Sequence, residues 1–194
     1  TTITAGDGAY VCTITFTDAL GNAASALTMT SFTLDTTVPT SSWTSISDTS
    51  LIEDETATLT VLLSEANSGF TNADITCDNG DVGTLSTADS LTYTGVFTPT
   101  AEVSDATNTC AIGTGWTDTA GNTGVGSTSS NYAIDGVDPT MTITSVTVTS
   151  GDTSNDATIA LAFASSESTS NLISGDVTIS AGTLSSFTGS GTSY

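Results

Sequence analysis

Short runs in which apolar residues alternate with small or polar ones are the feature that most constrains the fold of this chain. Such runs occur at 10–16, 59–63, 91–97 and 159–163, and Gly, Asn and Asp separate them. Alternation with period two, together with abundant Thr and β-branched residues, is typical of half-buried strands. No stretch shows a sustained helical period with caps. The pattern therefore predicts an all-β protein.

The second informative feature is an internal repeat. The heptapeptide FTDALGN at 16–22 returns as WTDTAGN at 116–122, and TLDTTVPT at 33–40 returns as AIDGVDPT at 133–140. Further on, ATLTV at 57–61 aligns with ATIAL at 157–161, while Ser64-Glu65 aligns with Ser166-Glu167 at an offset of 102. Small insertions would shift the offset in this way. We expect a tandem array with about 100 residues in each unit.

Proline-containing joints define the expected boundaries of the units. Pro39 and Pro139 each follow a strand that ends in Asp, and a proline fixes φ and biases the preceding residue to an extended conformation. The connections should therefore be short and stiff. Residues 1–35 are predicted to be the last two strands of one unit, 36–135 a complete unit, and 136–194 the first part of a third. On this interpretation the sequence is cut in mid-repeat at both ends.

A unit of about 100 residues, with about seven short strands and frequent turn signals, favours a Greek-key β-sandwich. The strand AYVCTITFTDALGN with the strand after it, the SE pair after the second strand, and the joint DTTVPT resemble the tandem bacterial-type immunoglobulin-like (Ig-like) repeats of large extracellular adhesins and surface fibres. The resemblance extends over the whole chain. It implies tandem Ig-like β-sandwiches at the cell surface.

Charge composition excludes several classes of function. The 194 residues include no Lys, Arg or His and 21 acidic residues, which gives a formal net charge of −21. Nucleic-acid binding and attraction to anionic membranes both need cationic side chains. No apolar run approaches the roughly 20 residues of a membrane-spanning helix. Without His or Lys, the Ser, Thr and Cys side chains have no obvious activating base. We therefore expect no enzymatic activity, no nucleic-acid partner and no direct membrane insertion.

The repeated heptapeptide has a structural interpretation within the fold that the resemblance implies. There it ends the sixth strand and turns into the seventh, with Phe16 and Trp116 as inward-facing anchors. Gly or Asn accepts positive φ in such turns, and Asp bonds to nearby backbone N–H groups. The turn residues are Asp18, Gly21 and Asn22 in the first copy and Asp118, Gly121 and Asn122 in the second.

Calcium binding is the functional alternative for the same acidic residues. Ca²⁺ takes six to eight oxygen ligands, and this chain offers carboxylates and carbonyls. In the implied fold, the turn after strand six and the loop after strand two lie at the end that receives the preceding joint. The expected ligands are Asp35, Glu65 and Asp118 at the first joint and Asp135, Asp138 and Glu167 at the second. Bound metal would neutralise repulsion and stiffen the array.

The three cysteines suggest a disulfide within the implied fold. Cys12 aligns with Cys110 in strand six, and Cys77 lies 33 residues earlier in an expected neighbouring strand. We predict a bridge between Cys77 and Cys110, worth about 3.5 to 4 kcal/mol, with a partner for Cys12 outside the sequence. Ile179 stands where a third copy of Cys77 would fall. Buried free thiols are the alternative. A bridged domain fits an oxidising, extracellular compartment.

Three kinds of function remain open. The favoured one is a non-catalytic segment of an extracellular stalk, fibre or filament, whose partners are neighbouring repeats and further fibre subunits through self-assembly. An adhesin module for a glycan, surface or protein would need an exposed aromatic platform, but the alternation predicts inward positions for the aromatic residues Trp43, Tyr93, Phe97, Trp116 and Tyr132. The third is binding to an ordered lattice such as ice through outward rows of Thr, as at 140–149. Separate chains that complete each other head to tail are an alternative to a longer covalent array.

Overall fold

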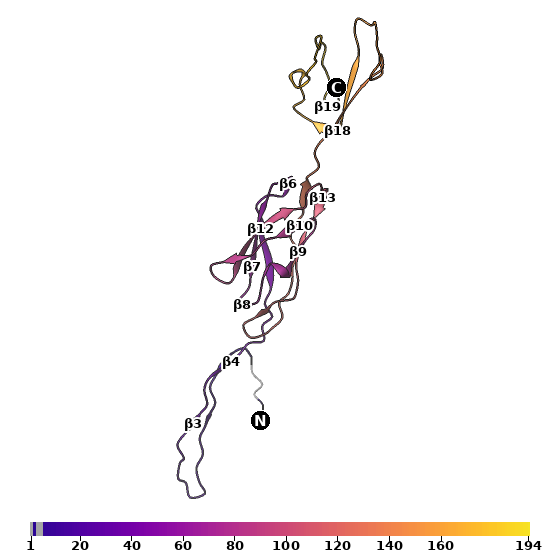
Figure 1. Ribbon diagram of the computed structural model, residues 1–194. Coiled ribbons are helices and arrows are strands. Elements are labelled where there is room, and N and C mark those ends of the chain that lie inside the picture. Colours follow the sequence, from indigo (N-terminus) through magenta and orange to yellow (C-terminus); the bar gives the residue numbers. More distant parts are fainter. Residues whose placement is uncertain (1, 3–5) are drawn as a thin grey trace. The chain divides into compact units, whose positions relative to one another are not determined.

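The computed structural model describes residues 2 and 6–194, and its regular structure is built from β-strands and two single-turn 3₁₀ helices (Figure 1). No helix in this described part is long and apolar enough to cross a membrane. The chain divides into two compact units, one that ends at Gly136 and one that begins at Val137. The prediction of an all-β protein is confirmed.

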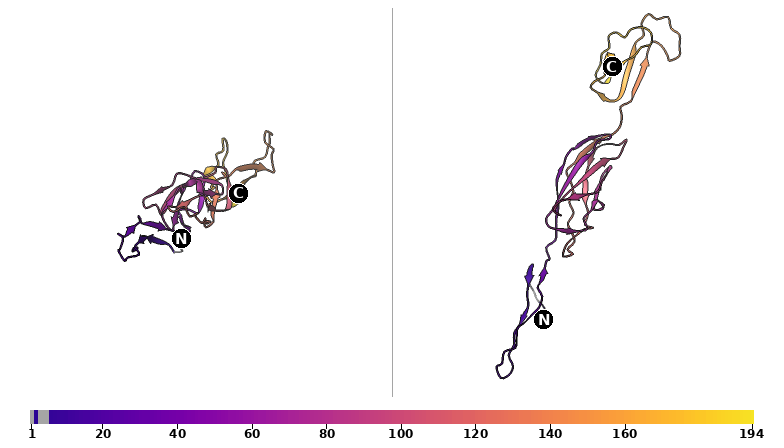
Figure 2. Two further views of the ribbon diagram at one scale, coloured as in Figure 1. Left: turned by 90° about the horizontal axis from the view of Figure 1, so that it is seen from below. Right: turned by 60° about the vertical axis from the view of Figure 1, so that its left-hand side comes forward.

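Two sheets form a sandwich within the first unit, which Figure 2 shows from two further directions. The larger sheet has the order β14-β9-β10-β12-β7-β5, with β11 beside β12, and the smaller has the order β13-β16-β6. In the larger sheet the strands are β5 (Ser41–Ile46), β7 (Ala57–Leu63), β9 (Ile75–Cys77), β10 (Gly80–Val82), β11 (Ser86–Thr87), β12 (Thr92–Pro99) and β14 (Cys110–Ile112). In the smaller sheet they are β6 (Ser50–Ile52), β13 (Ser104–Asn108) and β16 (Tyr132–Asp135).

The core of this sandwich follows from the alternation in the sequence. Every second residue of β7, from Ala57 to Leu63, is buried, and the residues between them face outward or are half-buried. Phe97 and Tyr132 meet edge to face with ring centroids 5.0 Å apart. The Tyr132 hydroxyl donates to the carbonyl of Asp78, and burial, followed by the Asp78 charge, raises the pKa of Tyr132 to about 12. This phenol therefore stays protonated and fixes the turn between β9 and β10.

Trp116 is the largest fully buried side chain of the sandwich. It packs edge to face against Phe70, with centroids 5.6 Å apart, and its indole N–H donates to the carbonyl of Gly113. The position of Gly124 leaves no room for a side chain, because a Cβ there would lie 2.2 Å from the indole ring. Trp116 is thus the inward anchor that the sequence predicts.

A separate hairpin precedes the sandwich in the first unit. β1 (Gly8–Tyr10) pairs with β4 (Phe32–Leu34), and β2 (Thr13–Ile14) pairs with β3 (Leu27–Thr28). Phe16 is 64% exposed in this hairpin, so the prediction that it is an inward anchor is wrong for this structure. The reason is that the hairpin has its turn and its strands but no second sheet to face it among the described residues.

The second unit contains a three-stranded sheet in the order β17-β18-β19, formed by β17 (Met141–Ser145), β18 (Leu161–Thr169) and β19 (Gly191–Ser193). The order of these three strands in their sheet is the same as that of β5, β7 and β12 in the sandwich. Phe163 exchanges backbone hydrogen bonds with Tyr194, as Val61 pairs with Tyr93. Phe163 therefore corresponds to Val61 at an offset of 102, so the offset of 100 expected for ATIAL does not hold for the paired part of this strand.

A short 3₁₀ helix follows at the same place in each unit, η1 (Asn72–Asp74) in the first and η2 (Ser174–Asp176) in the second. In each, the aspartate at the third position accepts from the backbone N–H of the residue before the helix, at 2.9 Å. The next residues form strand β9 in the sandwich. In the second unit, Val177 has an extended backbone, but residues 177–179 are not assigned to a strand.

Candidate metal site beside the first joint

The loop that carries Glu65 is fixed to the first joint by a reciprocal pair of hydrogen bonds. The backbone N–H of Thr40 donates to Ser64 Oγ, and the backbone N–H of Ser64 donates to the carbonyl of Thr40, both at 2.9 Å. Thr140 and Ser166 form the same pair in the second unit, again with both distances 2.9 Å. The Ser-Glu motif therefore places its glutamate at the end of the sheet where the joint enters.

Asp118 is held by the turn that follows β15 (Thr117–Asp118), a short strand paired with β8 (Asn67–Ser68). Its Oδ1 accepts from the backbone N–H groups of Ala120, Gly121 and Asn122 at 2.7–2.8 Å, and its Oδ2 accepts from Asn122 Nδ2 at 2.8 Å. Gly121 has a φ of 100°, which favours glycine at this place in the turn. The predicted turn chemistry is therefore present around Asp118.

The same turn is built in the N-terminal hairpin. Asp18 Oδ1 accepts from the backbone N–H groups of Leu20 and Asn22, and its Oδ2 accepts from Asn22 Nδ2 at 2.7 Å. Gly21 has a φ of 91°. The two turns thus have the same local structure although Asp118 is buried and Asp18 is exposed. Their geometry comes from the local sequence.

Hydrogen bonds outweigh burial in setting the charge state of Asp118. Burial by itself raises the pKa of this carboxyl, but the Asn122 side chain and the backbone N–H groups of the turn lower it, so that the pKa lies below the ordinary value of 3.8. Asp118 therefore carries a negative charge at neutral pH while it is 1% exposed. A buried carboxylate with no cationic partner is costly unless hydrogen bonds or a metal compensate it.

Asp35 and Glu65 lie beside Asp118 and complete a cluster of three carboxylates. One oxygen from each can be chosen so that all three lie within 4.8 Å of one another. Asn122 Nδ2 also donates to the backbone carbonyl of Asp35 at 3.1 Å, which ties the joint to the turn. Glu65 is half-buried, and burial, then the charges of Asp35, Asp118 and Asp7, raise its pKa above the ordinary 4.5. The site thus concentrates negative charge.

The donor set of this cluster suits a hard cation. Three carboxylates supply oxygen ligands only, and Ca²⁺ prefers oxygens at 2.3–2.6 Å with a flexible coordination number. No Lys, Arg or His exists in the chain to neutralise the cluster instead. The remaining ligands would have to come from water or carbonyl groups. The residues present therefore fit a calcium ion in number of charges and in ligand type.

The sequence identified the three clustered residues but missed the contribution of Asp7. The Asp7 carboxylate accepts from the backbone N–H and the hydroxyl of Thr36 and from the hydroxyl of Thr37, and these bonds hold its pKa below the ordinary value. It connects the hairpin to the joint and adds to the charge around Glu65. The one sequence signal for Asp7 is its position directly before β1, at the same end of the hairpin as the joint.

The second predicted ligand set is divided between the two units. Asp135 ends β16 in the first unit, where its Oδ1 accepts from Ser104 Oγ at 3.0 Å, whereas Asp138 and Glu167 belong to the second. Glu167 follows Ser166 as Glu65 follows Ser64. This set stays a prediction.

The predicted disulfide joins Cys77 and Cys110, which lie opposite each other on β9 and β14 with their Cα atoms 4.0 Å apart. Cys110 is fully buried and belongs to the same hydrophobic cluster as Trp116 and Tyr132. Cys12 is a half-exposed free thiol. The bridge links the edge strand β14 to its neighbour β9 in the larger sheet, and Cys12 stays outside it.

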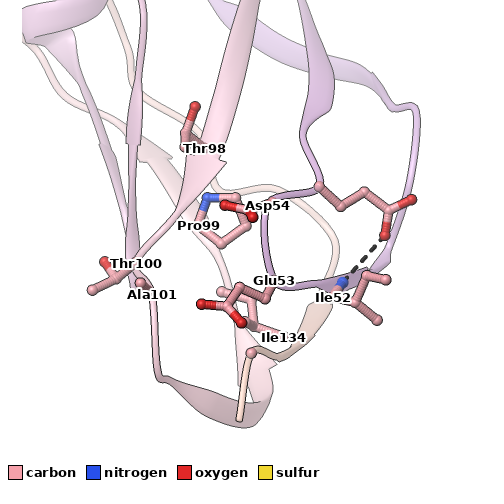
Figure 3. Close-up of a pocket in the computed structure, with 10 residues that line it drawn as sticks. Ile52, Glu53, Asp54, Thr98, Pro99, Thr100, Ala101 and Ile134 are labelled. Carbon is pink, nitrogen blue, oxygen red and sulfur yellow. Dashed lines mark hydrogen bonds between the residues drawn. The ribbon is translucent and has the colours of Figure 1, made fainter. Parts of the chain in front are cut away.

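A small pocket lies at the other end of the sandwich, between the β6–β7 turn and the end of β12 (Figure 3). Its volume is about 50 Å³, and Ile52, Asp54, Pro99 and Ile134 are among its lining residues. Glu55 Oε2 accepts from the backbone N–H of Ile52 at 3.2 Å. Pockets for small organic ligands are usually several hundred Å³ in volume. This one is too small to hold a substrate.

Comparison with known proteins identifies the sandwich. Residues 35–134 match the family model of the bacterial Ig-like domain. Neither a curated protein nor a solved structure matches the chain. The matched range begins at the acidic residue of the first joint and ends within β16.

Proposed function

Because the chain belongs to the bacterial Ig-like domain family, we propose that it is a non-catalytic structural segment of an extracellular stalk or fibre. The segment would consist of Ig-like units in series, with neighbouring repeats and further fibre subunits as its partners. Members of this family generally act as structural or adhesive modules at the cell surface, and the Cys77–Cys110 disulfide is consistent with an oxidising environment.

The observation that carries this proposal is the repeated joint. The reciprocal bonds between Thr40 and Ser64 occur again between Thr140 and Ser166, next to Pro39 and Pro139. At the first joint, the backbone N–H of Val125 also donates to the carbonyl of the buried Pro39 at 2.8 Å. These bonds fix the start of each unit to its own second strand, and the proline before it restricts φ to one value. The same attachment at the start of two units supports a chain built from repeated modules in series.

Immunogold electron microscopy of the source cells tests the stalk proposal. An antibody raised against residues 36–135 should label filaments or projections outside the cell, and mild protease treatment of intact cells should remove the label. Trypsin is unsuitable for this treatment because the chain has no Lys or Arg. Label confined to the cell interior would contradict the proposal.

An adhesin module is the second candidate function. In residues 36–135, all of which the structure describes, every Phe, Tyr and Trp is buried or half-buried. The half-buried Trp43 donates its indole N–H to the carbonyl of Ser127 at 3.3 Å. No aromatic platform for a sugar ring therefore lies on this sandwich. Binding of the chain to a glycan array at micromolar concentration would favour the adhesin function over the purely mechanical one.

We also propose that Asp35, Glu65 and Asp118 bind Ca²⁺ and stiffen the joint. The support is the nearness of their oxygens, the raised pKa of Glu65 and the hard, oxygen-only donor set. A cation there would offset the mutual repulsion of three carboxylates. It would also connect the joint, the loop after β7 and the turn after β15, which come from distant parts of the sequence.

Thermal unfolding with and without calcium tests this site. The melting temperature of the chelator-treated chain should rise when Ca²⁺ is added at physiological salt, because the metal binds only the folded state. Glu65→Gln should remove most of the rise. Glu102→Gln provides the matched control, since it makes the same charge change at an exposed residue outside the cluster. An equal rise in all three proteins would mean that calcium acts elsewhere, and no rise would remove the site.

A further inference from the structure

The chain enters and leaves the sandwich at opposite ends. Thr40, just after the first joint, exchanges hydrogen bonds with Ser64, which directly follows β7. Gly136, just after β16, lines the pocket at the other end, beside Thr98 and Pro99 of β12. Strand β7 runs antiparallel to both β5 and β12, so β5 leads from the entry end towards the exit end. A stretching load carried by the chain therefore acts along the strands of the sandwich.

A parallel contact attaches the first strand of the sandwich to the last part of its chain. Thr40 forms a parallel bridge with Val125, whose N–H donates to the carbonyl of Pro39 at 2.8 Å. The N–H of Ser41 donates to the carbonyl of Val125 at 3.2 Å. Ser41 Oγ also donates to this carbonyl at 3.0 Å and lies 3.0 Å from Ser127 Oγ. We call this set of bonds the entry contact.

A second parallel contact lies in the smaller sheet. Residues 50–52 of β6 pair with 133–135 of β16, the strand by which the chain leaves the sandwich. Leu51 is 1% exposed and its pairing partner Ile134 is 2% exposed. Water therefore has little access to the backbone bonds around them. We call this ladder the exit contact.

The direction of the load relative to these contacts decides how they fail. The first strand is pulled towards the entry end and the last strand towards the exit end, so parallel partners slide past each other along their length. All the bonds of a contact are then loaded together, whereas strands peeled apart from one end lose their bonds one at a time. Forced unfolding depends on the rate of unfolding, so simultaneous loading raises resistance to force.

The disulfide lies between the two contacts in the sequence. It joins Cys77 and Cys110, whose sequence separation is 33, and β10, β11, β12 and β13 belong to the segment that it closes. When the rest of the sandwich unfolds under load, the force passes directly through this covalent bond. The closed segment then contributes nothing to the extension of the chain.

We propose that the sandwich is a load-bearing module in which the entry and exit contacts resist stretching by shear and the Cys77–Cys110 bridge limits the extension when they fail. The inference deepens the stalk proposal and depends on it for its biological role. The two can fail separately. A sandwich that is weak under force would leave an extracellular location intact, and absence of label outside the cell would leave a measured resistance to force intact.

Stretching of single molecules tests the limit on extension. The full chain is held by its two ends, and the length gained when the sandwich unfolds is measured with and without a reductant. Reduction should lengthen this step by about 110–120 Å, because 33 further residues join the extended chain. Cys77→Ser with Cys110→Ser should show the longer step without reductant. A step of equal length in oxidised and reduced chains would overturn the role of the bridge.

A change in the direction of pulling tests the shear geometry. In the variant Ala66→Cys with Cys12→Ser, one handle is attached to the introduced thiol and the other to the N-terminal end of the chain. Ala66 is exposed and follows Ser64 closely, so both attachments load the entry end and peel β5 away from β7. The sandwich should open at a clearly lower force than when the same variant is held by its two ends. Equal forces in the two directions would overturn the shear mechanism.

Two serine variants test the entry contact itself. Ser41→Ala removes the hydroxyl that bonds to Val125 and should speed unfolding under a constant end-to-end load roughly 5-fold, as expected for one lost hydrogen bond. Ser42→Ala is the matched control, because its hydroxyl bonds to the carbonyl of Leu62 on the antiparallel neighbour β7. It should leave the rate nearly unchanged. Equal rates in the two variants would overturn the assignment of the load to the entry contact.

Discussion

Two hairpins of this protein share a turn motif and have opposite surroundings. The hairpin 8–34 and residues 104–135 share the turn built around Asp18 and Asp118, the positive φ of Gly21 and Gly121, and the strand pairing on either side. Yet Phe16 is 64% exposed and Trp116 is 1% exposed. Local sequence forms the hairpin, and only a facing sheet gives it a core.

The comparison also explains the acidic cluster. Asp118 is buried and lies beside Asp35 and Glu65, whereas Asp18 has the same turn and is exposed. The side-chain bond from Asn22 lowers the pKa of Asp18 most, and the backbone bonds of the turn lower it further. For Asp118 the same kinds of bond must first overcome burial. An identical motif is thus a simple turn in one place and part of a candidate metal site in another.

Truncating the aromatic anchor of each hairpin should give the largest difference between them. Trp116→Ala removes a fully buried side chain and should lower the free energy of unfolding of the sandwich by about 3–5 kcal/mol. Phe16→Ala in the monomeric chain should change it by less than about 0.5 kcal/mol, because Phe16 is exposed. Urea unfolding followed by the fluorescence of Trp43, which lies in the same sandwich, measures both. Comparable losses in the two variants would mean that Phe16 is packed in solution.

The disulfide should give the next largest effect, and it too separates the hairpins. Cys77→Ser with Cys110→Ser should lower the stability of the sandwich by about 3–4 kcal/mol, as expected for a bridge with a sequence separation of 33. Cys12→Ser serves as the control, since Cys12 is a free thiol, and should leave the denaturation midpoint unchanged. A double variant as stable as the unaltered chain would show that the bridge has no stabilising role.

The joint bonds should contribute less. Ser64→Ala removes the hydroxyl that accepts from the N–H of Thr40 and should cost about 1 kcal/mol of sandwich stability. Ser166→Ala removes the same bond in the second unit, and its effect should be confined to that unit. The hydrogen-exchange rates of the Thr40 and Thr140 amides report on the two joints separately. Exchange at Thr40 that is as slow in the Ser64→Ala variant as in the unaltered chain would show that this hydroxyl does not protect it.

A change of pH should have the smallest effect on folding stability, and the direction of this effect should differ between Glu65 and Asp118. The folded-state pKa of Glu65 is raised, so in metal-free buffer stability should increase as pH falls from neutrality towards 4.5 and Glu65 gains its proton. The folded-state pKa of Asp118 is lowered, so its contribution is present above 3.8 and is lost at more acidic pH. Melting temperatures measured across this range should pass through a maximum.

Glu65→Gln should remove the increase on the neutral side of this maximum and leave the acid decline. The control Glu102→Gln should keep both limbs of the profile. A profile that declines steadily from neutral pH in the unaltered chain would contradict the raised pKa of Glu65. Added calcium should flatten the neutral limb, because the metal replaces the proton in relieving repulsion.

Much of the candidate site could be predicted because its parts are local motifs. The Asp118 turn, the Ser64-Glu65 pair and the Asp35 joint each have a recognisable signature, and the resemblance to Ig-like repeats places them at one end of the sandwich. The contribution of Asp7 was missed because its carboxylate acts across the chain, through bonds to Thr36 and Thr37. No periodicity marks such a contact.

The sequence by itself determined the strands, the turns and the repeat. Period-two alternation and the glycines that adopt positive φ at Gly21 and Gly121 are local features, because each depends on only a few neighbouring residues. The pairing of Cys77 with Cys110 needed in addition the fold that the resemblance to Ig-like repeats implies. Only the tertiary structure decided which apolar faces are covered. Burial depends on a second sheet supplied from elsewhere, so Trp116 lies in a core and Phe16, in the same motif, lies in solvent.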